Sequence, residues 1–116
     1  LNTPRVSREA SGTSGMTASM NGSIHFSTND GWHPEFSENG CNSFTIPPID
    51  NTLPPEEQDI LDNKNMMDIL ENEIIPMYYD RPAQWTQMMK HAIGDVVPAF
   101  DSGRMVNEYY VKMYDI

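Results

Sequence analysis

Two short segments of this chain alternate apolar and polar residues in the way that is typical of β-strands. They are Ser23–Thr28, in which Ile24 and Phe26 alternate with polar neighbours, and Ser43–Ile46. Two strands of this length make a poor sheet by themselves, because a stable sheet needs further strands or a helix packed on its apolar face. We therefore expect part of an α/β domain, whose missing strands lie upstream of Leu1.

The start of the chain and its charge set limits on function. The chain opens at Leu1 without Met, and Leu1–Glu9 lacks the basic start and apolar run of a signal peptide, which suggests a piece of a longer protein. No apolar run approaches the roughly 18 residues of a membrane span, and the single cysteine, Cys41, excludes an internal disulfide. The net charge of −10, with no basic cluster, excludes nucleic acids and anionic membranes as partners.

A short helix and a proline-rich connector flank the predicted strands. Met16 and Met20 lie four residues apart and predict a helix of about two turns. Asn21-Gly22 ends this helix, because both residues tolerate positive φ. The segment Pro47–Pro55 follows the second strand and is a connector, since proline cannot donate a hydrogen bond to a strand.

Residues 56–116 are predicted to form three helices. Pro76 is expected to kink or end the first, which carries Ile60, Met67, Leu70, Ile74 and Met77 at helical spacing. Asp80 is expected to cap the second, which has Pro82 in its first turn and ends at Pro98. Asp101 or Ser102 is expected to cap the third.

Apolar stripes on these helices predict which faces are buried. The Met and Tyr residues at 66–78 and 105–114, including Met105, Tyr109 and Met113, are predicted to be core faces of packed helices. The apolar stripe of the second helix consists of Trp85, Met88, Met89, Ala92, Ile93 and Val96.

The segment Ser11–Gly15 (SGTSG) is the strongest candidate for a binding site. A loop of Gly, Ser and Thr that leads into a helix presents backbone N–H groups and the positive end of the helix dipole to phosphates and sugar hydroxyls. The alternative is a capped helix after a flexible linker. The patterns of P-loops, dinucleotide-binding loops and nucleophile elbows are absent. Glu9 precedes the loop and has two interpretations. It is either a residue that binds a sugar hydroxyl or acts as a base, or a solvated acid near a helix start.

Other residues with chemical potential have simpler explanations. His25, His33 and Cys41 match no pattern of metal ligands, and we expect no metal site. His25 is predicted to lie in a strand and His33 in a loop. Trp32 has two interpretations, a platform that stacks on a sugar or a cover for the edge of the core.

The loop and its surroundings carry a specific resemblance. Glu9–Met16 reads EASGTSGM, and Ala18–Gly22 (ASMNG) and Asp30–Trp32 (DGW) follow it. Together they closely resemble the active-site segment of the α-glucan (glycogen, starch and maltodextrin) phosphorylases, and most of all their shorter bacterial branch. The likeness extends over essentially the whole chain, through Glu38–Gly40, Leu70–Asp80 and Arg104–Tyr109.

This resemblance implies a fold and domain boundaries. These phosphorylases are glycosyltransferases with two Rossmann-like domains, the GT-B type, and this chain resembles the C-terminal portion of the second. Residues 1–50 would be the end of that domain and would carry the sugar and phosphate loop at 9–17. Residues 51–116 would be the Pro-rich connector and three terminal helices of the same domain.

The resemblance also implies an activity, phosphorolysis of α-1,4-glucans to glucose 1-phosphate. Glu9, Ala10, Ser11 and Gly12 would bind sugar hydroxyls, and Thr13 and Ser14 would hold the phosphate of pyridoxal 5′-phosphate. It implies a cytoplasmic enzyme and leaves a homodimer open. The active site would lie between two domains, so we expect the fragment alone to be inactive, and no catalytic residue is assigned within it.

One position departs from the family pattern. The lysine that forms the Schiff base with pyridoxal phosphate directly follows the Met of the motif, and here that position is Thr17. A hydroxyl cannot form an imine, so covalent attachment is lost at this site. Three interpretations remain: a phosphorylase that holds its cofactor noncovalently, a glycosyltransferase or synthase-associated module without the cofactor, and an inactive glucan-binding relic.

Overall fold

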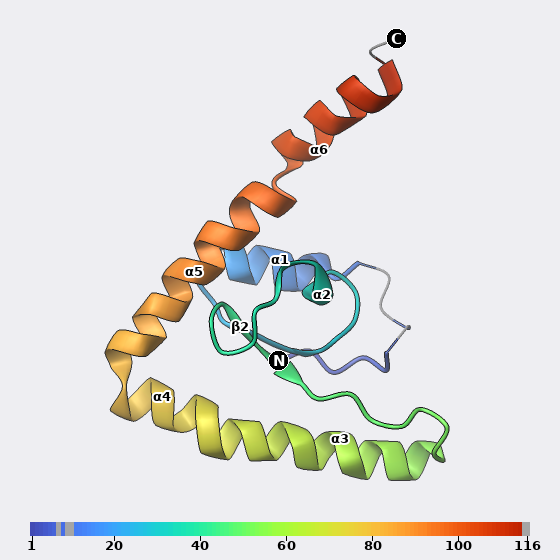
Figure 1. Ribbon diagram of the computed structural model, residues 1–116, viewed down its shortest axis with the longest axis vertical. Helices are drawn as coiled ribbons and strands as arrows, with labels where there is room; N and C mark the ends of the chain where they lie inside the picture. Colours follow the sequence, from blue (N-terminus) through green and yellow to red (C-terminus); the bar gives the residue numbers. More distant parts are fainter. Residues whose placement is uncertain (7, 9–10, 115–116) are drawn as a thin grey trace.

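The computed structural model of this protein describes residues 1–6, 8 and 11–114. They form a flattened body with extents of 51 × 40 × 18 Å. Figure 1 shows two long helices, α3 and α5, at an angle to each other, with the strands and the two short helices α1 and α2 between them. None of the helices in this described part is long and apolar enough to cross a membrane.

The sheet is small and parallel, and together with the surrounding helices it is compatible with the predicted α/β fold class. Strand β1 (His25–Thr28) pairs with β2 (Ser43–Ile46), with His25 opposite Ser43 and Thr28 opposite Ile46. Both strands were predicted from the alternating pattern. On the other edge of β1, Asn2 bridges to Ser27, and its backbone N–H donates to the carbonyl oxygen of Phe26 at 2.9 Å.

Both faces of the sheet are covered. Phe26 and Phe44 share one face and pack with Ile46 and Met88 in a buried cluster. His25 and Ser43 occupy the opposite face and are also buried. Strands buried on both sides are typical of parallel sheets in α/β proteins, where helices lie over each face.

Helix α1 (Thr13–Met20) confirms the predicted short helix, and Gly22 leaves it with φ 93°, as predicted for the glycine exit. A second helical turn, α2 (His33–Phe36), was not predicted, and the placement of His33 in a loop was wrong. Pro34 explains the turn physically, because its fixed φ suits the first turn of a helix and its missing N–H is not needed there.

The first long helix differs from prediction around Pro76. Helix α3 (Pro55–Ile69) passes through a π-helical turn, η1 (Leu70–Ile74), into α4 (Ile75–Asp80). In a regular α-helix, the ring of Pro76 would meet the carbonyl of Asn72, and a wider π turn just before the proline relieves that contact. The helical backbone therefore continues past Pro76. Leu70, Ile74 and Met77 pack against the core as expected, whereas Ile60 is exposed.

Helix α5 (Pro82–Phe100) begins with Pro82 at its first position, as predicted, but Arg81 and not Asp80 precedes it as N-cap, without a capping side-chain hydrogen bond. Asp80 instead ends α4, so the prediction that it caps α5 was wrong. The helix also continues through Pro98 to Phe100. The prediction that Pro98 ends this helix was therefore wrong by two residues; the proline lies in the last turn, where few helical hydrogen bonds remain to be lost.

Helix α5 links two separate parts of the core. Met88 joins the cluster around the sheet, while Val96 packs with Trp32 and Phe36 in a second cluster. Ala92 lies between them and is fully buried. The apolar stripe predicted for this helix is thus confirmed at its centre, although Ile93 at its margin is exposed.

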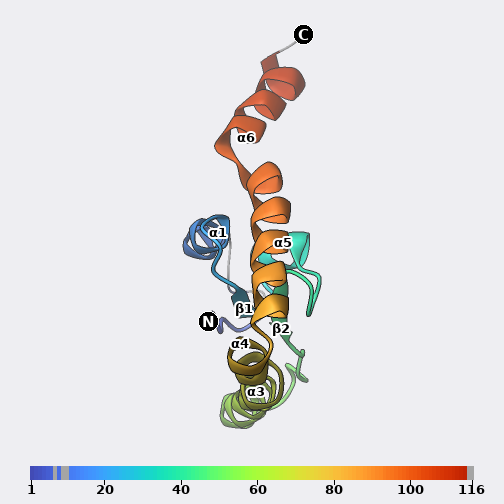
Figure 2. The same cartoon turned by 90° about the vertical axis from the view of Figure 1, so that its left-hand side faces the viewer.

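The last helix, α6 (Ser102–Tyr109), continues into the π-helical segment η2 (Tyr110–Tyr114). The Asp101 carboxylate accepts a hydrogen bond from the Gly103 N–H, which confirms one of the two predicted caps. Figures 1 and 2 show this end projecting away from the rest of the chain. Met105 is 48% exposed and Tyr109 52% exposed, so the prediction that this stripe is a core face is wrong for the described residues.

Candidate functional site

The candidate site is the loop that enters α1. Gly12 has φ 97°, a left-handed conformation that favours glycine, and its carbonyl oxygen accepts the backbone N–H groups of Gly15 and Met16. The first N–H groups of a helix have no partner within the helix. Ser11, Thr13 and Ser14 are exposed here, so the start of α1 is open to a ligand.

Two hydrogen bonds fasten the loop to the turn after β1. The Trp32 backbone N–H donates to the Ser11 carbonyl oxygen at 2.8 Å. On the other side, the Arg8 backbone N–H donates to the Asp30 carboxylate at 2.9 Å. One backbone hydrogen bond and one side-chain acceptor, Asp30, therefore hold the segments on either side of residues 9–10 to the turn.

Gly15, in the first turn of α1, lies directly over two buried rings. A β-carbon at Gly15 would be 2.6 Å from His25 Nε2 and 2.9 Å from Trp32 Nε1. Both nitrogens are buried and have no hydrogen-bond partner among the residues that the structure describes. A side chain at residue 15 would need one of these rings or the helix to move.

A chain of hydrogen bonds continues beneath the loop. His25 Nδ1 lies 2.8 Å from His33 Nδ1, and His33 Nε2 lies 2.8 Å from Thr45 Oγ1. One imidazole must donate and the other accept, and the Thr45 hydroxyl can match either arrangement. In both tautomers His25 Nε2 remains at the free end of the chain.

Burial keeps both imidazoles neutral. Together with a smaller effect of the neighbouring His33, it lowers the pKa of His25 from 6.5 to about 4. Burial likewise lowers the pKa of His33 from 6.5 to about 4. Neither ring is positioned to act as a cation toward a ligand at neutral pH.

Trp32 belongs to the core. Its side chain is 2% exposed, stacks on Phe36 with ring centroids 4.3 Å apart, and meets Phe100 edge-on at 5.2 Å. A ring enclosed in this way has no free face for a sugar. Of the two interpretations of Trp32, the structure supports the one in which it covers the core.

Thr17, the position of the expected lysine, lies on the exposed side of α1. Its hydroxyl donates to the Thr13 carbonyl oxygen at 3.1 Å, an ordinary contact between successive helical turns. The chain has lysines only at 64, 90 and 112, and Lys64 pairs with Asp68 on α3. The start of α1 has exposed residues and helix N–H groups of the kind that can hold a phosphate, whereas Thr17 has no amine for the covalent attachment of pyridoxal phosphate.

The other predicted site residues fall into two groups. Glu9 and Ala10 lie outside the described residues. His25 and His33 are brought together, but Cys41 does not join them, and among the described residues no group of three or more His, Cys, Asp or Glu side chains is arranged for a metal ion.

Asn42 is a structural residue that the sequence reading missed. It is fully buried, and its amide donates to the Phe36 carbonyl oxygen at 2.9 Å and to the Asp95 carboxylate at 2.8 Å. Its side-chain oxygen accepts the backbone N–H of Glu38 at 2.8 Å. A single amide therefore connects α2 and the start of β2 to α5. The only signal in the sequence is an Asn directly before a predicted strand, which does not by itself indicate this role.

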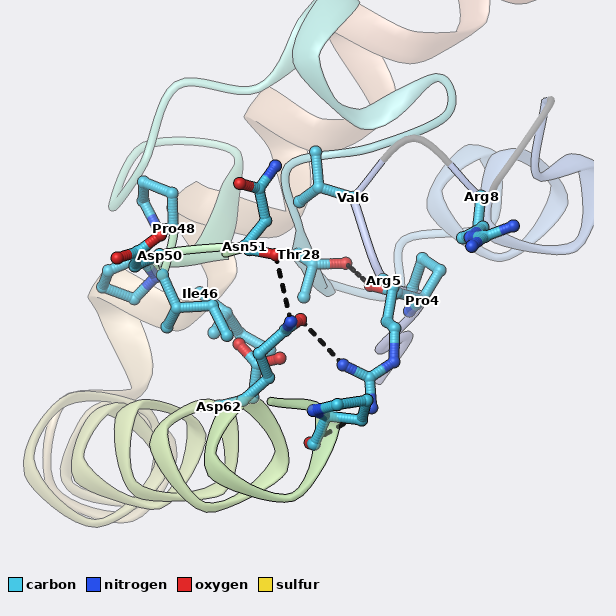
Figure 3. A pocket seen from close by; sticks show the side chains of 14 residues that line it. Pro4, Arg5, Val6, Arg8, Thr28, Ile46, Pro48, Asp50, Asn51 and Asp62 are labelled. Carbon is cyan, nitrogen blue, oxygen red and sulfur yellow. Dashed lines mark hydrogen bonds between the residues drawn. The ribbon is translucent and has the colours of Figure 1, made fainter. Parts of the chain in front are cut away.

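A second hollow lies at the carboxyl ends of the two strands. This cavity of about 610 Å³ is lined by Thr28 and Ile46, by the connector, by α3 and by the N-terminal segment. The Arg5 guanidinium projects toward α3 there and binds the Gln58 side chain and the Asp59 carboxylate, as Figure 3 shows in part. The edge at the carboxyl ends of parallel strands is where α/β folds commonly bind ligands, but here the Arg5 guanidinium is already paired with Gln58 and Asp59.

Comparison with known proteins identifies the family that the loop resembles. The chain is 46% identical over 116 residues to maltodextrin phosphorylase of Thermococcus litoralis and 42% identical over 119 residues to glycogen phosphorylase of Aquifex aeolicus. It is 33% identical to glycogen phosphorylase of Mycobacterium tuberculosis. These matches cover 98% of this chain but only 14% to 17% of the relatives. No protein-family model and no solved structure matches the chain.

The matches confirm the resemblance to α-glucan phosphorylases. They run over nearly the whole chain and are not restricted to the motif at the start of α1. The chain is therefore homologous to a short segment of glycogen and maltodextrin phosphorylases, about one seventh of their length.

Proposed function

We propose that this chain, homologous to a segment of the α-glucan phosphorylases, is part of a GT-B type glycosyltransferase that phosphorolyses α-1,4-glucans to glucose 1-phosphate. The observation that supports this most directly is the exposed SGTSG loop at the start of α1, in a chain 46% identical to a maltodextrin phosphorylase. Residues 1–50 would complete the second Rossmann-like domain, and residues 51–116 would add its connector and terminal helices. The parent would be a cytoplasmic enzyme.

In this proposal the loop binds sugar and phosphate through its backbone. Ser11 and Gly12, with Glu9 and Ala10 before them, would contact sugar hydroxyls. Thr13 and Ser14 would receive the phosphate of pyridoxal phosphate at the positive end of the helix dipole. When bound, that cofactor supplies a phosphate group as an acid–base partner for the substrate phosphate, and Thr17 would leave it held without a covalent bond.

The experiment that tests the proposal uses the intact parent protein. It is incubated with a maltooligosaccharide and inorganic phosphate, with and without added pyridoxal phosphate, and glucose 1-phosphate is measured. Product that depends on the cofactor is the expected result. Absence of product under both conditions would contradict the proposed activity.

Thr17 favours a second candidate, a cofactor-independent glycosyltransferase or a glucan-binding relic. The variant Thr17→Lys separates the two, because it returns an amine to the exposed side of α1 where a bound cofactor could be captured. Covalent capture, trapped by borohydride and detected by mass, would support a cofactor pocket. Thr17→Arg is the matched control, since it restores the charge without a nucleophilic amine. No capture with Thr17→Lys would favour the second candidate.

The role of Glu9 is tested separately. Glu9→Gln in the parent removes a charge that would accept hydrogen bonds from a sugar, and we expect the KM for the glucan to rise at least about tenfold. Glu57→Gln is a suitable control, because this acid is exposed in the first turn of α3. An unchanged KM for Glu9→Gln would count against its assignment as a sugar ligand.

A further inference from the structure

We infer that His25 and Trp32 are positioning residues for the sugar and phosphate loop. Through their contact with Gly15, they fix how closely the first turn of α1 approaches the protein interior. The ligands of the loop come from the proposed function, so the inference rests on it in that respect. The contact itself lies between described residues: the two rings are buried, and Gly15 is half-buried.

The contact leaves no spare room. A β-carbon on Gly15 would come within 2.6 Å of His25 Nε2, within 3.0 Å of His25 Cδ2 and within 2.9 Å of Trp32 Nε1. Carbon atoms in packed interiors do not approach other heavy atoms this closely. The two rings therefore form the floor on which the helix rests at Gly15.

The floor is itself held in place from below. His25 is joined to His33, and His33 to Thr45 on β2, by hydrogen bonds of 2.8 Å each. Trp32 is clamped between Phe36 and Phe100. An atom added at Gly15 would consequently displace the helix and its loop more readily than either ring.

The chemistry of the floor argues against a role in packing alone. His25 Nε2 and Trp32 Nε1 are buried without hydrogen-bond partners among the described residues, and unpaired polar atoms in an interior are unfavourable. An apolar floor would be more stable. Flat rings with short polar edges do, however, allow the backbone of α1 to approach closely at Gly15. The backbone N–H of Trp32 separately holds the Ser11 carbonyl oxygen at 2.8 Å.

The decisive variant is Gly15→Ala in the intact parent. Its matched control is Gly94→Ala, because Gly94 is also helical and a β-carbon there meets nothing within 4 Å. We expect Gly15→Ala to raise the KM for phosphate and maltooligosaccharide at least tenfold, and Gly94→Ala to leave both unchanged. Simple loss of stability would lower the active fraction and hence kcat, but would not change KM, so a kcat effect alone would overturn the inference.

A second-site variant tests the contact directly. Gly15→Ala/His25→Ala removes the closer contact of the added methyl group, 2.6 Å to His25 Nε2, and leaves only the one at 2.9 Å to Trp32 Nε1. We expect this partial relief to give a KM at least threefold below that of Gly15→Ala alone. A KM equal to or above that of Gly15→Ala would overturn the inference. If Gly15→Ala does not fold, recovery of folded parent in the double variant supports the contact, and no recovery overturns it.

Hydrogen exchange of the peptide that covers residues 11–20 provides a readout that needs no activity. Exchange should be faster in Gly15→Ala than in the parent and slower again in the double variant. If the parent makes no glucose 1-phosphate, the proposed function fails while this measurement still decides the role of the two rings. Unchanged exchange in Gly15→Ala would overturn the positioning role.

Discussion

His25 Nδ1 and His33 Nδ1 face each other at 2.8 Å inside the protein, and the two rings share a single hydrogen-bonding proton between them. They come from different elements, β1 and α2, and Thr45 of β2 completes the chain. Burial disfavours a positive charge on either ring, and a second positive charge at this distance would also be strongly repelled.

Stability should therefore fall as the solution becomes acidic. Both folded-state pKa values lie near 4, below the usual 6.5, so the unfolded chain binds protons that the folded chain does not. The contribution is fully present above about pH 6.5 and is lost as the pH falls toward 4. Thermal unfolding of the parent between pH 7.5 and 5 would show this, with a smaller pH dependence in His33→Asn. The exposed His91→Gln is the control, and an identical slope in His33→Asn would contradict the assignment.

The side-chain amide of Asn42 should make a large contribution to the free energy of unfolding. Asn42→Ala leaves the Phe36 carbonyl and the Glu38 N–H without a partner, which we expect to destabilise the fold by at least about 2 kcal/mol. Asn39→Ala, which removes one exposed hydrogen bond to the Thr45 N–H, should cost about 1 kcal/mol or less. Urea unfolding of the two variants measures the difference. Equal losses in the free energy of unfolding would contradict the importance of the Asn42 hydrogen bonds.

The buried face of α5, which includes Met88, should contribute more to the free energy of unfolding than the exposed face of the same helix. Met88 is 2% exposed between the sheet and the long helices, and Met88→Ala should cost about 2–5 kcal/mol through the cavity that it leaves. Lys90 is exposed two residues later, and Lys90→Ala should change the free energy of unfolding by no more than about 0.5 kcal/mol. The same unfolding experiment checks both, and a small effect at Met88 would contradict the packing described here.

Capping at α6 gives a more local test. Asp101→Ala removes the acceptor for the Gly103 N–H and should reduce the stability of the helix by about 1 kcal/mol. Ser102→Ala should have a negligible effect, because Asp101 is the residue that caps the helix. Hydrogen exchange across residues 102–109 would measure this, and a larger effect from Ser102→Ala would reverse the assignment.

Local patterns predicted most of the elements correctly. Strands β1 and β2 are visible as alternating residues, and α1 as two methionines bounded by Asn21-Gly22, because each depends on neighbours in the sequence. Two of the errors arise where a proline meets a longer helix. Pro76 and Pro98 were expected to interrupt their helices, but a π turn before Pro76 accommodates its ring and Pro98 lies in the last turn of α5.

The candidate loop could be found from its sequence, but its support could not. Nothing near Ser11–Gly15 in the sequence indicates that His25, His33 and Trp32 gather beneath it, since this depends on how β1, α2 and α1 pack together. The exposure of Met105 and Tyr109 is a similar case. Their spacing indicates a helical face, but only the fold determines whether another element covers that face.

The close approach at Gly15 also bears on how homologues of this chain can diverge. A relative with a side chain at this position must make room for it, so we expect smaller residues at the positions of His25 and Trp32 in the same sequence. Where glycine is retained, those two positions are free to carry large rings. The three positions, separated by a helix and a strand, should therefore vary together during evolution.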